Sequence, residues 1–387
     1  MTAPVVTWLA EREAEAVRFL EALVNQDSGT YDRQDVNRLA DLLAGPLADL
    51  GFRPTRHPQT EYGDHWLWER PGTGPKRLLC ISHIDTVFAS GTAKARPFAV
   101  RGTRAMGPGV LDMKGGIAAM LMALRALHAT DSRAWREATI AWFLNSDEEV
   151  LSPTSRALIR AEAQRSTSVA VTEPARPGGE YVVARKGAGK FFLEVHGRNA
   201  HAGAQPELGR SAVWAMAQKI CELHAMTDLA EGTTVNVGVV RGGTRSNVIA
   251  DRWDAEIDLR AWTPAAAERA MTRFREIAAR THVQDTTAEL RGDLNFPPWP
   301  QGLPGTTALL ALMQAAGREL GLHLAGIPTG GGSDGNHACA VAPTIDGLGP
   351  QGSHAHSPDE FIELPTLIER AKVNARFVEL WVERFTG

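Results

Sequence analysis

The chain has 387 residues and a net charge of −4, with 43% hydrophobic and 22% charged residues. This composition is ordinary for a globular protein, and the length allows two or three domains with a sizeable core. It excludes the strongly basic domain typical of nucleic-acid binding, and no apolar run approaches the ~18 residues of a membrane span.

The N-terminal residues lack the basic segment and following apolar segment of a secretory signal. Their apolar residues fit a surface helix with one apolar face, formed by Val5, Leu9, Ala16, Phe19, Leu20 and Leu23. The three cysteines, Cys80, Cys221 and Cys339, are odd in number and far apart. We therefore expect reduced core cysteines in a cytoplasmic protein, rather than disulfides or a thiolate zinc site.

The first half of the chain alternates apolar strands and helices. Nearly continuous apolar runs at 77–82, 139–145 and 168–172 predict strands, and helical spacing predicts a helix at 115–128. Uninterrupted apolar strands are typical of a parallel sheet that is covered on both faces. We therefore predict an α/β fold with a doubly wound, mostly parallel sheet.

From about residue 187 the pattern changes to strand, helix, strand, strand, helix, strand. The expected elements are 190–197, 207–226, 233–240, 252–262, 264–280 and 286–295. This order is that of a ferredoxin-like α+β unit. A proline-rich segment at 296–305 then marks a boundary.

The remaining residues return to the first pattern, with a helix at 307–320, a buried strand at 341–349 and a final helix at 365–385. The chain therefore leaves the α/β domain, builds a small inserted domain and comes back. We predict a catalytic domain formed by residues 1–186 and 299–387. The insert, residues 187–298, would be a lid and dimerisation domain.

Histidine and acidic residues follow the ends of the predicted strands or lie in tight turns. They are His83, Asp112, Glu148, Glu149, Glu173 and His356. Ligands of open α/β sheets bind outside the carboxyl ends of the strands, so these side chains are expected to converge. Imidazoles and carboxylates together suit zinc or a similar first-row metal. Four gathered carboxylates would also repel one another unless dications were bound.

Each of these residues alone has an ordinary alternative. A histidine after a strand, such as His83, is more often a loop residue than a ligand. The pair Glu148 and Glu149 would usually be solvated surface, and GPG and KGG could simply be turns. The joint pattern favours a metal site, because several separate loops would otherwise have to be metal-like by chance.

Five motifs occur in a characteristic order: HIDTV at 83–87, GPGVLDMKGG at 107–116, NSDEE at 145–149, TEPA at 172–175 and HAHSPDE at 354–360. They resemble the metallopeptidase M20 family, and most closely its glutamate carboxypeptidase (carboxypeptidase G2-like) branch. The similarity runs over almost the whole chain, with family-like spacing between the motifs.

The resemblance implies a centre of two zinc ions, with cobalt and manganese as alternatives. His83, Asp112 and Glu173 would hold one ion. Asp112, Glu149 and His356 would hold the other, so that Asp112 bridges the two. His354 lies in the same motif as His356 and is the alternative ligand.

Further roles follow from the same resemblance. Glu148 would be the general base, and the carboxylate of Asp85 would orient the imidazole of His83. The family also has a cis peptide after the bridging aspartate, here between Asp112 and Met113.

In the insert, RNAHAGAQPELGRSA (198–212) looks like the family's lid and dimerisation motif. His201 would reach the partner subunit's active site in a homodimer and stabilise the oxyanion. Asn247 and Arg260 would hold the substrate carboxylate, since the guanidinium fork suits it. From alternation alone, Arg260 is equally a charge on the solvent face of a strand. Gly331 and Gly332 would belong to a glycine-rich loop lining the pocket.

These features together predict a cytoplasmic two-zinc hydrolase that acts on small-molecule substrates. We expect the protein to bind neither nucleic acid nor membrane. It would cleave an amide bond to release a C-terminal amino acid, as a glutamate-type carboxypeptidase does. An N-acyl-amino-acid amidohydrolase of the same superfamily, such as an aminoacylase, desuccinylase or dipeptidase, is the alternative. A catalytically silent dimeric scaffold is a further one, although every expected catalytic residue is present.

Overall fold

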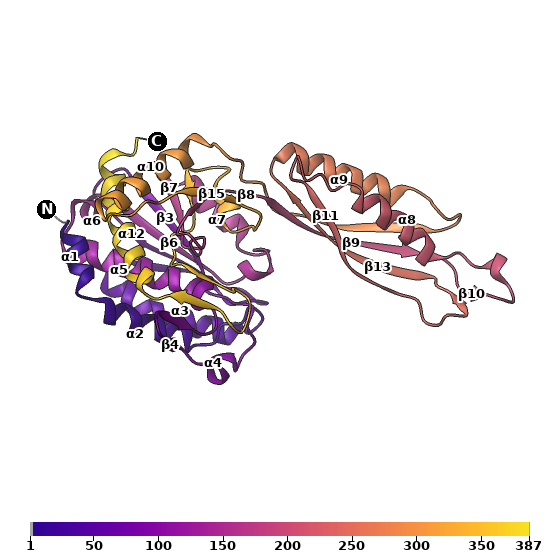
Figure 1. Cartoon of the computed structure of the whole chain (residues 1–387), viewed down its shortest axis with the longest axis horizontal. Helices are drawn as coiled ribbons and strands as arrows, with labels where there is room; N and C mark the ends of the chain where they lie inside the picture. Colours follow the sequence, from indigo (N-terminus) through magenta and orange to yellow (C-terminus); the bar gives the residue numbers. More distant parts are fainter. Residues whose placement is uncertain (1–2, 387) are drawn as a thin grey trace. The chain divides into compact units, whose positions relative to one another are not determined.

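The computed structural model describes residues 3–386. The chain divides into two compact units (Figure 1). Unit 1 comprises Met1–Ala184, Gln301–Pro328 and Ser333–Gly387, and unit 2 comprises Arg185–Pro300 and Thr329–Gly332. Residues 329–332, which the sequence analysis assigned to the catalytic domain, therefore group with the insert. Unit 1 is built from both ends of the chain, drawn in indigo and in yellow.

A six-stranded sheet forms the centre of unit 1. In spatial order its strands are β1 (Arg53–His57), β2 (His65–Arg70), β6 (Thr139–Asn145), β3 (Arg77–His83), β7 (Ser168–Val171) and β16 (Thr344–Ile345). The four strands from β6 to β16 are parallel; at one edge β2 pairs antiparallel with β6, and β1 pairs antiparallel with β2. This arrangement confirms the mostly parallel sheet.

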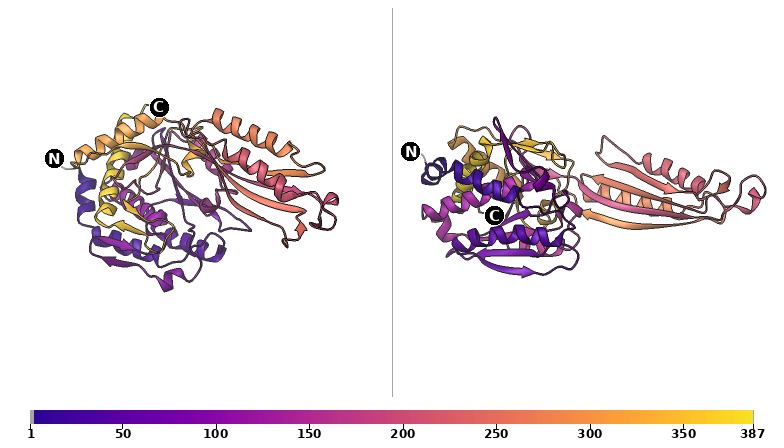
Figure 2. Two further views of the ribbon diagram at one scale, coloured as in Figure 1. Left: turned by 45° about the vertical axis from the view of Figure 1, so that its right-hand side comes forward. Right: turned by 90° about the horizontal axis from the view of Figure 1, so that it is seen from below.

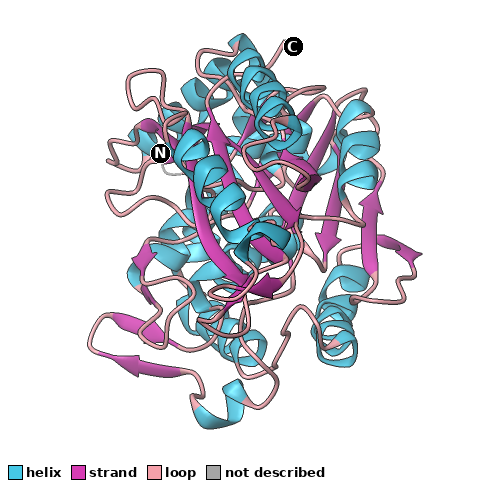
Figure 3. Cartoon of the chain, turned by 90° about the vertical axis from the view of Figure 1, so that its right-hand side faces the viewer, coloured by secondary structure: helices cyan, strands magenta, loops and turns pink. Residues whose placement is uncertain are grey.

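Helices cover both faces of this sheet, because alternate residues of its central strands face two separate cores. Leu78 and Cys80 of β3 belong to the larger core and Leu79 and Ile81 to the smaller. The larger core is built on α1 (Pro4–Ala10), α2 (Glu13–Val24), α3 (Arg33–Asp49), α5 (Gly115–Ala129), α6 (Arg133–Glu137), α10 (Pro304–Glu319) and α12 (Pro365–Arg384). The smaller core lies under α7 (Arg156–Gln164) and α11 (Gly335–Ala338). Figure 3 shows the mixed helix and strand content.

A second sheet of unit 1 was not expected from the sequence. Its order is β17 (Gly352–Ser353), β18 (Phe361–Glu363), β5 (Arg104–Met106) and β4 (Ala99–Arg101), all antiparallel. Ile362 pairs with Ala105 across the β18–β5 ladder. Segments far apart in sequence are therefore fixed side by side.

Unit 2 has the strand and helix order that the sequence predicts. Its elements are β9 (Gly187–His196), α8 (Ala212–His224), β11 (Thr234–Gly242), β13 (Arg252–Ala261), α9 (Pro264–Ala279) and β14 (Thr287–Phe296). The antiparallel sheet has the order β11-β13-β9-β14. Both helices lie on one face of this sheet (Figure 2), where Phe274 of α9 packs in one core with sheet residues such as Phe191 and Ile257.

Two sequence predictions need correction. The N-terminal apolar face does not form one helix, since α1 ends at Ala10 and α2 begins at Glu13. Cys80 and Cys339 are buried free thiols, but Cys221 is exposed, because it lies on a face of α8 that is turned away from the core of unit 2. None of the described helices is long and apolar enough to cross a membrane.

Candidate metal centre

Three neighbouring parallel strands deliver acidic and histidine residues to one edge of the sheet of unit 1. β3 ends at His83, β7 is followed by Glu173, and β6 is followed by the short turn η2 (Glu148–Val150). Parallel strands present their carboxyl ends at the same edge, so these side chains converge. His83 and Glu173 are buried.

The small β17-β18-β5-β4 sheet brings in the other two residues. Asp112 lies in the turn η1 (Val110–Lys114), which follows β5, and the peptide bond between Asp112 and Met113 is cis. His356 lies in the loop between β17 and β18. The β5–β18 ladder therefore explains how two residues 244 positions apart come into contact.

The first ligand set gathers around His83. Its Nε2 atom lies 3.0 Å from Oδ1 of Asp112 and 3.8 Å from Oε1 of Glu173. Burial lowers the pKa of His83, but the hydrogen bonds to Asp112 and Asp85 outweigh it and hold this pKa well above its usual range.

The second set gathers around His356. Its Nε2 atom lies 3.1 Å from Oδ2 of Asp112 and 3.1 Å from Oε2 of Glu149. These hydrogen bonds raise the pKa of His356 to about 10. The ring of His354 instead packs against Phe361, with centroids 5.9 Å apart. His356 is thus the histidine that joins the cluster, and the two oxygens of Asp112 each face one histidine.

Glu148 lies beside the first set. One oxygen of Glu148, one of Glu173 and one nitrogen of His83 lie within 4.8 Å of one another. Burial raises the pKa of Glu148 well above its usual range; the charge of His83 acts in the opposite direction, and the charges of Glu173, Asp334 and Glu149 raise this pKa further. A carboxyl group in this environment takes up a proton more readily than one in water.

Asp85 contacts both the imidazole of His83 and the turn that carries Glu148 and Glu149, although its backbone carbonyl, rather than its carboxylate, lies closer to the imidazole. Nδ1 of His83 lies 2.9 Å from the backbone carbonyl of Asp85 and 3.5 Å from its carboxylate. The carboxylate instead accepts backbone N–H groups from Glu148 and Glu149, each at 3.3 Å, and the hydroxyl of Thr30 at 2.8 Å. Asp85 therefore orients the imidazole of His83 through its carbonyl and the turn of Glu148 and Glu149 through its carboxylate.

The residues present fit a pair of dications. Oε1 of Glu149 is buried and has no hydrogen-bond partner among the described residues. Burial raises the pKa of Glu149, and the neighbouring carboxylates of Asp112 and Asp85 add to the rise. A buried acceptor without a donor is costly, and cations remove both that cost and the repulsion. The imidazole and carboxylate donors suit zinc, cobalt or manganese.

Glu360 supports the turn that carries Asp112 and was not singled out from the sequence. Its fully buried carboxylate accepts backbone N–H groups from Gly109 at 3.1 Å, Leu111 at 2.8 Å and Asp112 at 3.0 Å. Burial raises the pKa of Glu360 to about 7, although these donors act in the opposite direction. The motif HAHSPDE contains this glutamate, but its role depends on the approach of the η1 turn.

Asp334, which was also not singled out from the sequence, stabilises the chain on both sides of Glu148. Its carboxylate accepts hydrogen bonds from the side chains of Asn145 and Ser152, which lie on either side of the turn η2 that carries Glu148. Burial raises the pKa of Asp334 to about 7. The residue directly follows the glycine-rich segment 330–333, so the glycine motif was a signal for it.

Unit 2 holds the predicted residues of the substrate clamp. His201 in β10 (Ala200–His201) pairs with Val248 in β12 (Val248–Ile249), next to Asn247. The backbone N–H of Ala202 donates to the carbonyl of Asn247 at 3.0 Å. Nδ1 of the exposed His201 accepts backbone N–H groups from Gly203 and Ala204. This arrangement leaves the ring proton on Nε2.

Arg260 lies elsewhere in unit 2. It sits near the end of β13 opposite Ala188, whereas the first residue of β13, Arg252, pairs with His196. Nε and Nη2 of Arg260 bind the carboxylate of Asp258, at 2.9–3.1 Å. The structure therefore separates Arg260 along the sheet from the end where β9 leads into the His201 segment.

The glycine-rich loop is anchored within unit 2 by a residue that the sequence analysis missed. Nη1 of the buried Arg185 donates to the carbonyls of Gly331 and Gly332, each at 3.1 Å. The backbone N–H of Lys186 also donates to the carbonyl of Thr329. These contacts explain why 329–332 group with unit 2.

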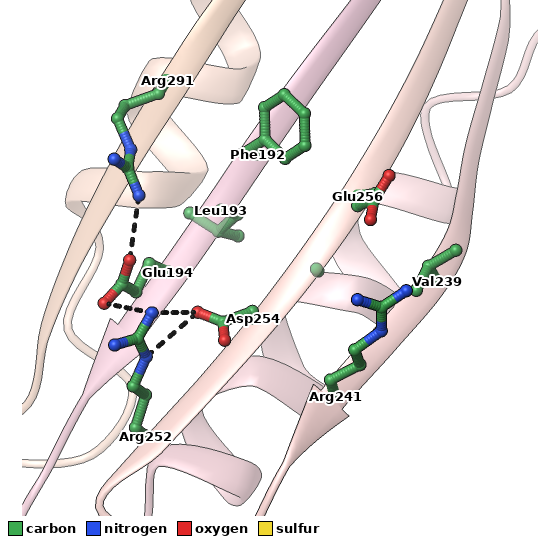
Figure 4. Close-up of a pocket in the computed structure, with 10 residues that line it drawn as sticks. Phe192, Leu193, Glu194, Val239, Arg241, Arg252, Asp254, Glu256 and Arg291 are labelled. Atoms are coloured by element: carbon green, nitrogen blue, oxygen red, sulfur yellow. Dashed lines mark hydrogen bonds and ion pairs between the residues drawn. The ribbon is translucent and has the colours of Figure 1, made fainter.

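A hollow of about 370 Å³ lies on the open face of the unit 2 sheet (Figure 4). Glu194 pairs there with Arg252 at 3.1 Å and Arg291 at 2.9 Å, and Arg252 also pairs with Asp254. These charges satisfy one another within the sheet. They differ in that respect from the carboxylates of the candidate metal centre, which have too few cationic side chains among them to balance their charge.

Residues 79–380 match the model of peptidase family M20/M25/M40. This match covers the strands and turns that carry every residue of the candidate metal centre. The chain belongs to this family. The M20 resemblance predicted from the motifs is therefore confirmed, and so is the prediction of a hydrolase that acts on amide bonds.

Two curated relatives illustrate the range of M20 proteins similar to this one. Carboxypeptidase G2 of Pseudomonas sp. (strain RS-16) is 30% identical over 376 residues, which cover 95% of this chain and 89% of the relative. Succinyl-diaminopimelate desuccinylase of Paracidovorax citrulli is 28% identical over 364 residues, covering 88% and 91%. Membership of this family therefore does not decide which substrate this protein cleaves.

Solved M20 structures share the fold. The aminopeptidase PepT from Bacillus cereus ATCC 10987 superposes with a TM-score of 0.80 at 23% identity, covering 95% of this chain and 98% of that one. The M20 metallo-carboxypeptidase Sso-CP2 from Sulfolobus solfataricus gives a TM-score of 0.77 at 16% identity, covering 96% and 100%. At these identities the likeness concerns the fold alone.

Proposed function

We propose that this chain is a two-metal amidohydrolase that releases an amino acid with a free carboxylate, as a carboxypeptidase does. One observation carries the proposal: the two oxygens of Asp112 face His83 and His356 separately, at 3.0 and 3.1 Å. A single carboxylate between two imidazoles is the arrangement that a bridging ligand needs.

Two zinc ions are the proposed cofactors, with cobalt and manganese as alternatives. His83, Asp112 and Glu173 would hold one ion, and Asp112, Glu149 and His356 would hold the other. When bound, such ions lower the pKa of a water towards neutrality and polarise the scissile carbonyl.

Glu148 is the proposed general base. Its environment raises its pKa well above the usual range, mainly through burial. A base with a raised pKa can accept the proton of the attacking water and then deliver it to the leaving amine. The backbone N–H of Glu148 donates to Asp85, which holds the turn in place for both transfers.

His201, Asn247, Arg260 and the loop of Gly331 and Gly332 are the proposed substrate-binding residues. The Nε2 proton of His201 suits a donor to the oxyanion. Burial lowers the pKa of Lys186, and the positive charge of the nearby Arg260 lowers it further. Two neighbouring cations favour binding of a carboxylate, which would compete with Asp258 for the guanidinium of Arg260.

A homodimer through unit 2 is part of the proposal. Val239 and Val240 on the edge strand β11, and Trp214 on α8, are exposed apolar side chains. Exposed apolar groups on one unit are typical of an interface. Light scattering should then give twice the chain mass of 41.8 kDa, and a monomer at micromolar concentration would contradict this point. Cytoplasmic localisation stays a prediction.

A desuccinylase is the second candidate, because succinyl-diaminopimelate desuccinylases cover most of this chain at 28% identity. The two candidates share the reaction and differ in the acyl group. An aminoacylase or dipeptidase would differ in the same way.

Release of free amino acids from a panel of N-acyl amino acids and dipeptides tests the proposed function. The metal-free protein is first prepared with a chelator and then reloaded with zinc, cobalt or manganese. We expect hydrolysis that returns with two metal ions per chain, and the panel identifies the leaving amino acid. A chain that binds two ions and hydrolyses nothing, or that hydrolyses without metal, would contradict the proposal.

A further inference from the structure

A hollow of about 560 Å³ in unit 1 opens beside the metal centre. Its walls are the segments 29–32 and 86–90, and its third side is formed by Glu149 and Val150. Glu149 is therefore both a proposed metal ligand and part of this hollow. The volume lies in the range of pockets that enclose small organic ligands.

The two walls are joined by backbone contacts, so the hollow exists before any substrate binds. Thr30 N donates to the carbonyl of Thr86 at 3.1 Å, and Thr86 N donates to the carbonyl of Ser28 at 2.8 Å. A Cβ atom on Gly29 would lie 2.4 Å from the carbonyl oxygen of Phe88, so only glycine allows this close approach. A preformed site loses little conformational entropy on binding.

The same walls are tied to the catalytic groups. The hydroxyl of Thr30 donates to Asp85 at 2.8 Å, and the carboxylate of Asp85 accepts the backbone N–H groups of Glu148 and Glu149. The hollow therefore has a fixed position relative to the general base. A group bound in the hollow therefore lies next to Glu149, at one side of the metal centre.

Most of the surface of the hollow is apolar. Four large hydrophobic residues of unit 1 are exposed in the part of the chain that the structure describes: Tyr31, Leu42, Val87 and Val100. Two of these, Tyr31 at 74% and Val87 at 45% exposure, line the hollow, and Phe88 and Val150 line it as well. Isolated exposed hydrophobic residues are common, but several that line one hollow indicate a binding site.

The hollow carries no cation to receive an acidic group. Among the described residues, no lysine, arginine or histidine lines it, whereas Asp32 and Glu149 do. Arg96 stacks on the ring of Phe88 but uses its guanidinium to bind the carbonyl of Pro358. A carboxylate placed in the hollow would thus meet the carboxylate of Asp32 and no cationic side chain among the lining residues.

We propose that this hollow binds the acyl side of the substrate, and that the acyl group is uncharged and apolar, such as an aromatic or branched alkyl acyl group, rather than a dicarboxylic one such as succinyl. The inference rests on the proposed amidohydrolase function and narrows its substrate class. Burial of the acyl group against Tyr31 and Val87 would supply the preference.

The test compares N-acetyl, N-benzoyl, N-(4-methylpentanoyl) and N-succinyl derivatives of one amino acid, the best leaving residue of the panel described above. We expect kcat/KM for the benzoyl compound to exceed that for the succinyl compound by about 10- to 100-fold. Equal values, or a preference for succinyl, with the N-acetyl compound still hydrolysed, would overturn this inference and leave the proposed function standing. Hydrolysis of none of the four would overturn both.

Two variants locate the preference in this hollow. Tyr31→Ala should lower kcat/KM for the benzoyl compound by about tenfold more than kcat/KM for the small N-acetyl compound. Val87→Arg should narrow the benzoyl-to-succinyl ratio by supplying the missing cation. Val100→Arg is the matched control, because Val100 is 48% exposed and does not line the hollow. A Val87→Arg ratio equal to that of Val100→Arg would place the acyl group elsewhere and overturn the inference.

Discussion

The carboxylate of Glu360 accepts the backbone N–H of Asp112 at 3.0 Å, while the side chain of Asp112 faces the two histidines. The same Glu360 oxygen also accepts the N–H of Leu111. The carboxylate of Glu360 thus holds the turn that orients the side chain of Asp112, and it does so from a fully buried position.

We predict that Glu360→Gln weakens metal binding by about 10- to 100-fold, as loss of supporting contacts behind a ligand commonly does. A glutamine offers one acceptor where the turn supplies donors to two oxygens, so one donor faces an amide N–H. Metal titration of the chelator-treated protein measures the effect. Glu363→Gln is the control, because Glu363 binds Arg104 and Thr103 at the surface. Equal affinities for the two variants would contradict the prediction.

Glu148 and Glu149 are adjacent, but replacing each with alanine should have a different effect on metal content and turnover. Glu148→Ala should retain both metal ions and lose turnover by about 10²- to 10⁴-fold, as removal of a general base does. Glu149→Ala should lose the ion that His356 also holds. Metal content and kcat, measured side by side, separate the two roles. Loss of metal in Glu148→Ala with retention in Glu149→Ala would reverse the assignment.

Gly116 lies in the first turn of α5 against the end of β7. A Cβ atom there would lie 1.8 Å from the carbonyl oxygen of Thr172, the residue before Glu173. Gly116→Ala should therefore destabilise the protein by about 2 kcal/mol or more, since a packed backbone must move. It should also weaken metal binding by shifting Asp112 relative to Glu173.

Urea unfolding of the metal-free protein measures this effect on stability. Gly330→Ala is the comparison, because a Cβ atom at Gly330 meets nothing within 4 Å. We expect that variant to unfold near the wild-type midpoint. A Gly116→Ala midpoint equal to it would mean that the α5–β7 contact is looser than described.

Acid should destabilise unit 1 through His337. Burial, with the charges of Arg156 and Arg160, lowers the pKa of this histidine from 6.5 to about 3. Between these values the unfolded chain binds the proton and the folded chain does not, so stability falls as pH drops below 6.5. The loss amounts to about 2 kcal/mol at pH 5.

His337→Gln should lessen the decline in the free energy of unfolding between pH 8 and pH 5 by that amount, whatever it costs at pH 8. Urea titrations at the two pH values give the difference. His323→Gln, at an exposed position, should keep the wild-type decline. An unchanged decline in His337→Gln would show that this histidine is protonated in the folded protein.

The central strands and the inserted unit were predictable because their patterns are strong. β6 has the bounds predicted from TIAWFLN, since a strand buried on both faces needs an unbroken apolar run. β1 and β2 were not predicted, because RPTRH and HWLWER mix polar and apolar residues at a sheet edge. The strands β17 and β18, two and three residues long, carry no pattern that a sequence could display.

The candidate site was predictable to a similar degree. His83, Asp112 and Glu173 stand in recognisable motifs, because donor atoms for a metal must come from a few residue types. The roles of Glu360, Thr30 and Arg185 depend on backbone groups of distant segments. Such partners become visible only once the chain is folded, since any residue can offer its N–H or carbonyl.

The order of the ligands along the chain has a consequence for biosynthesis. All of unit 2 lies between Glu173 and His356 in the sequence. A nascent chain therefore carries four of the five proposed ligands long before the ribosome adds His356 and the β18 strand that fixes η1. Unit 1 therefore cannot complete its metal centre until this last segment has been synthesised. Unit 2, formed by an almost continuous stretch, can fold while unit 1 still waits for its last third.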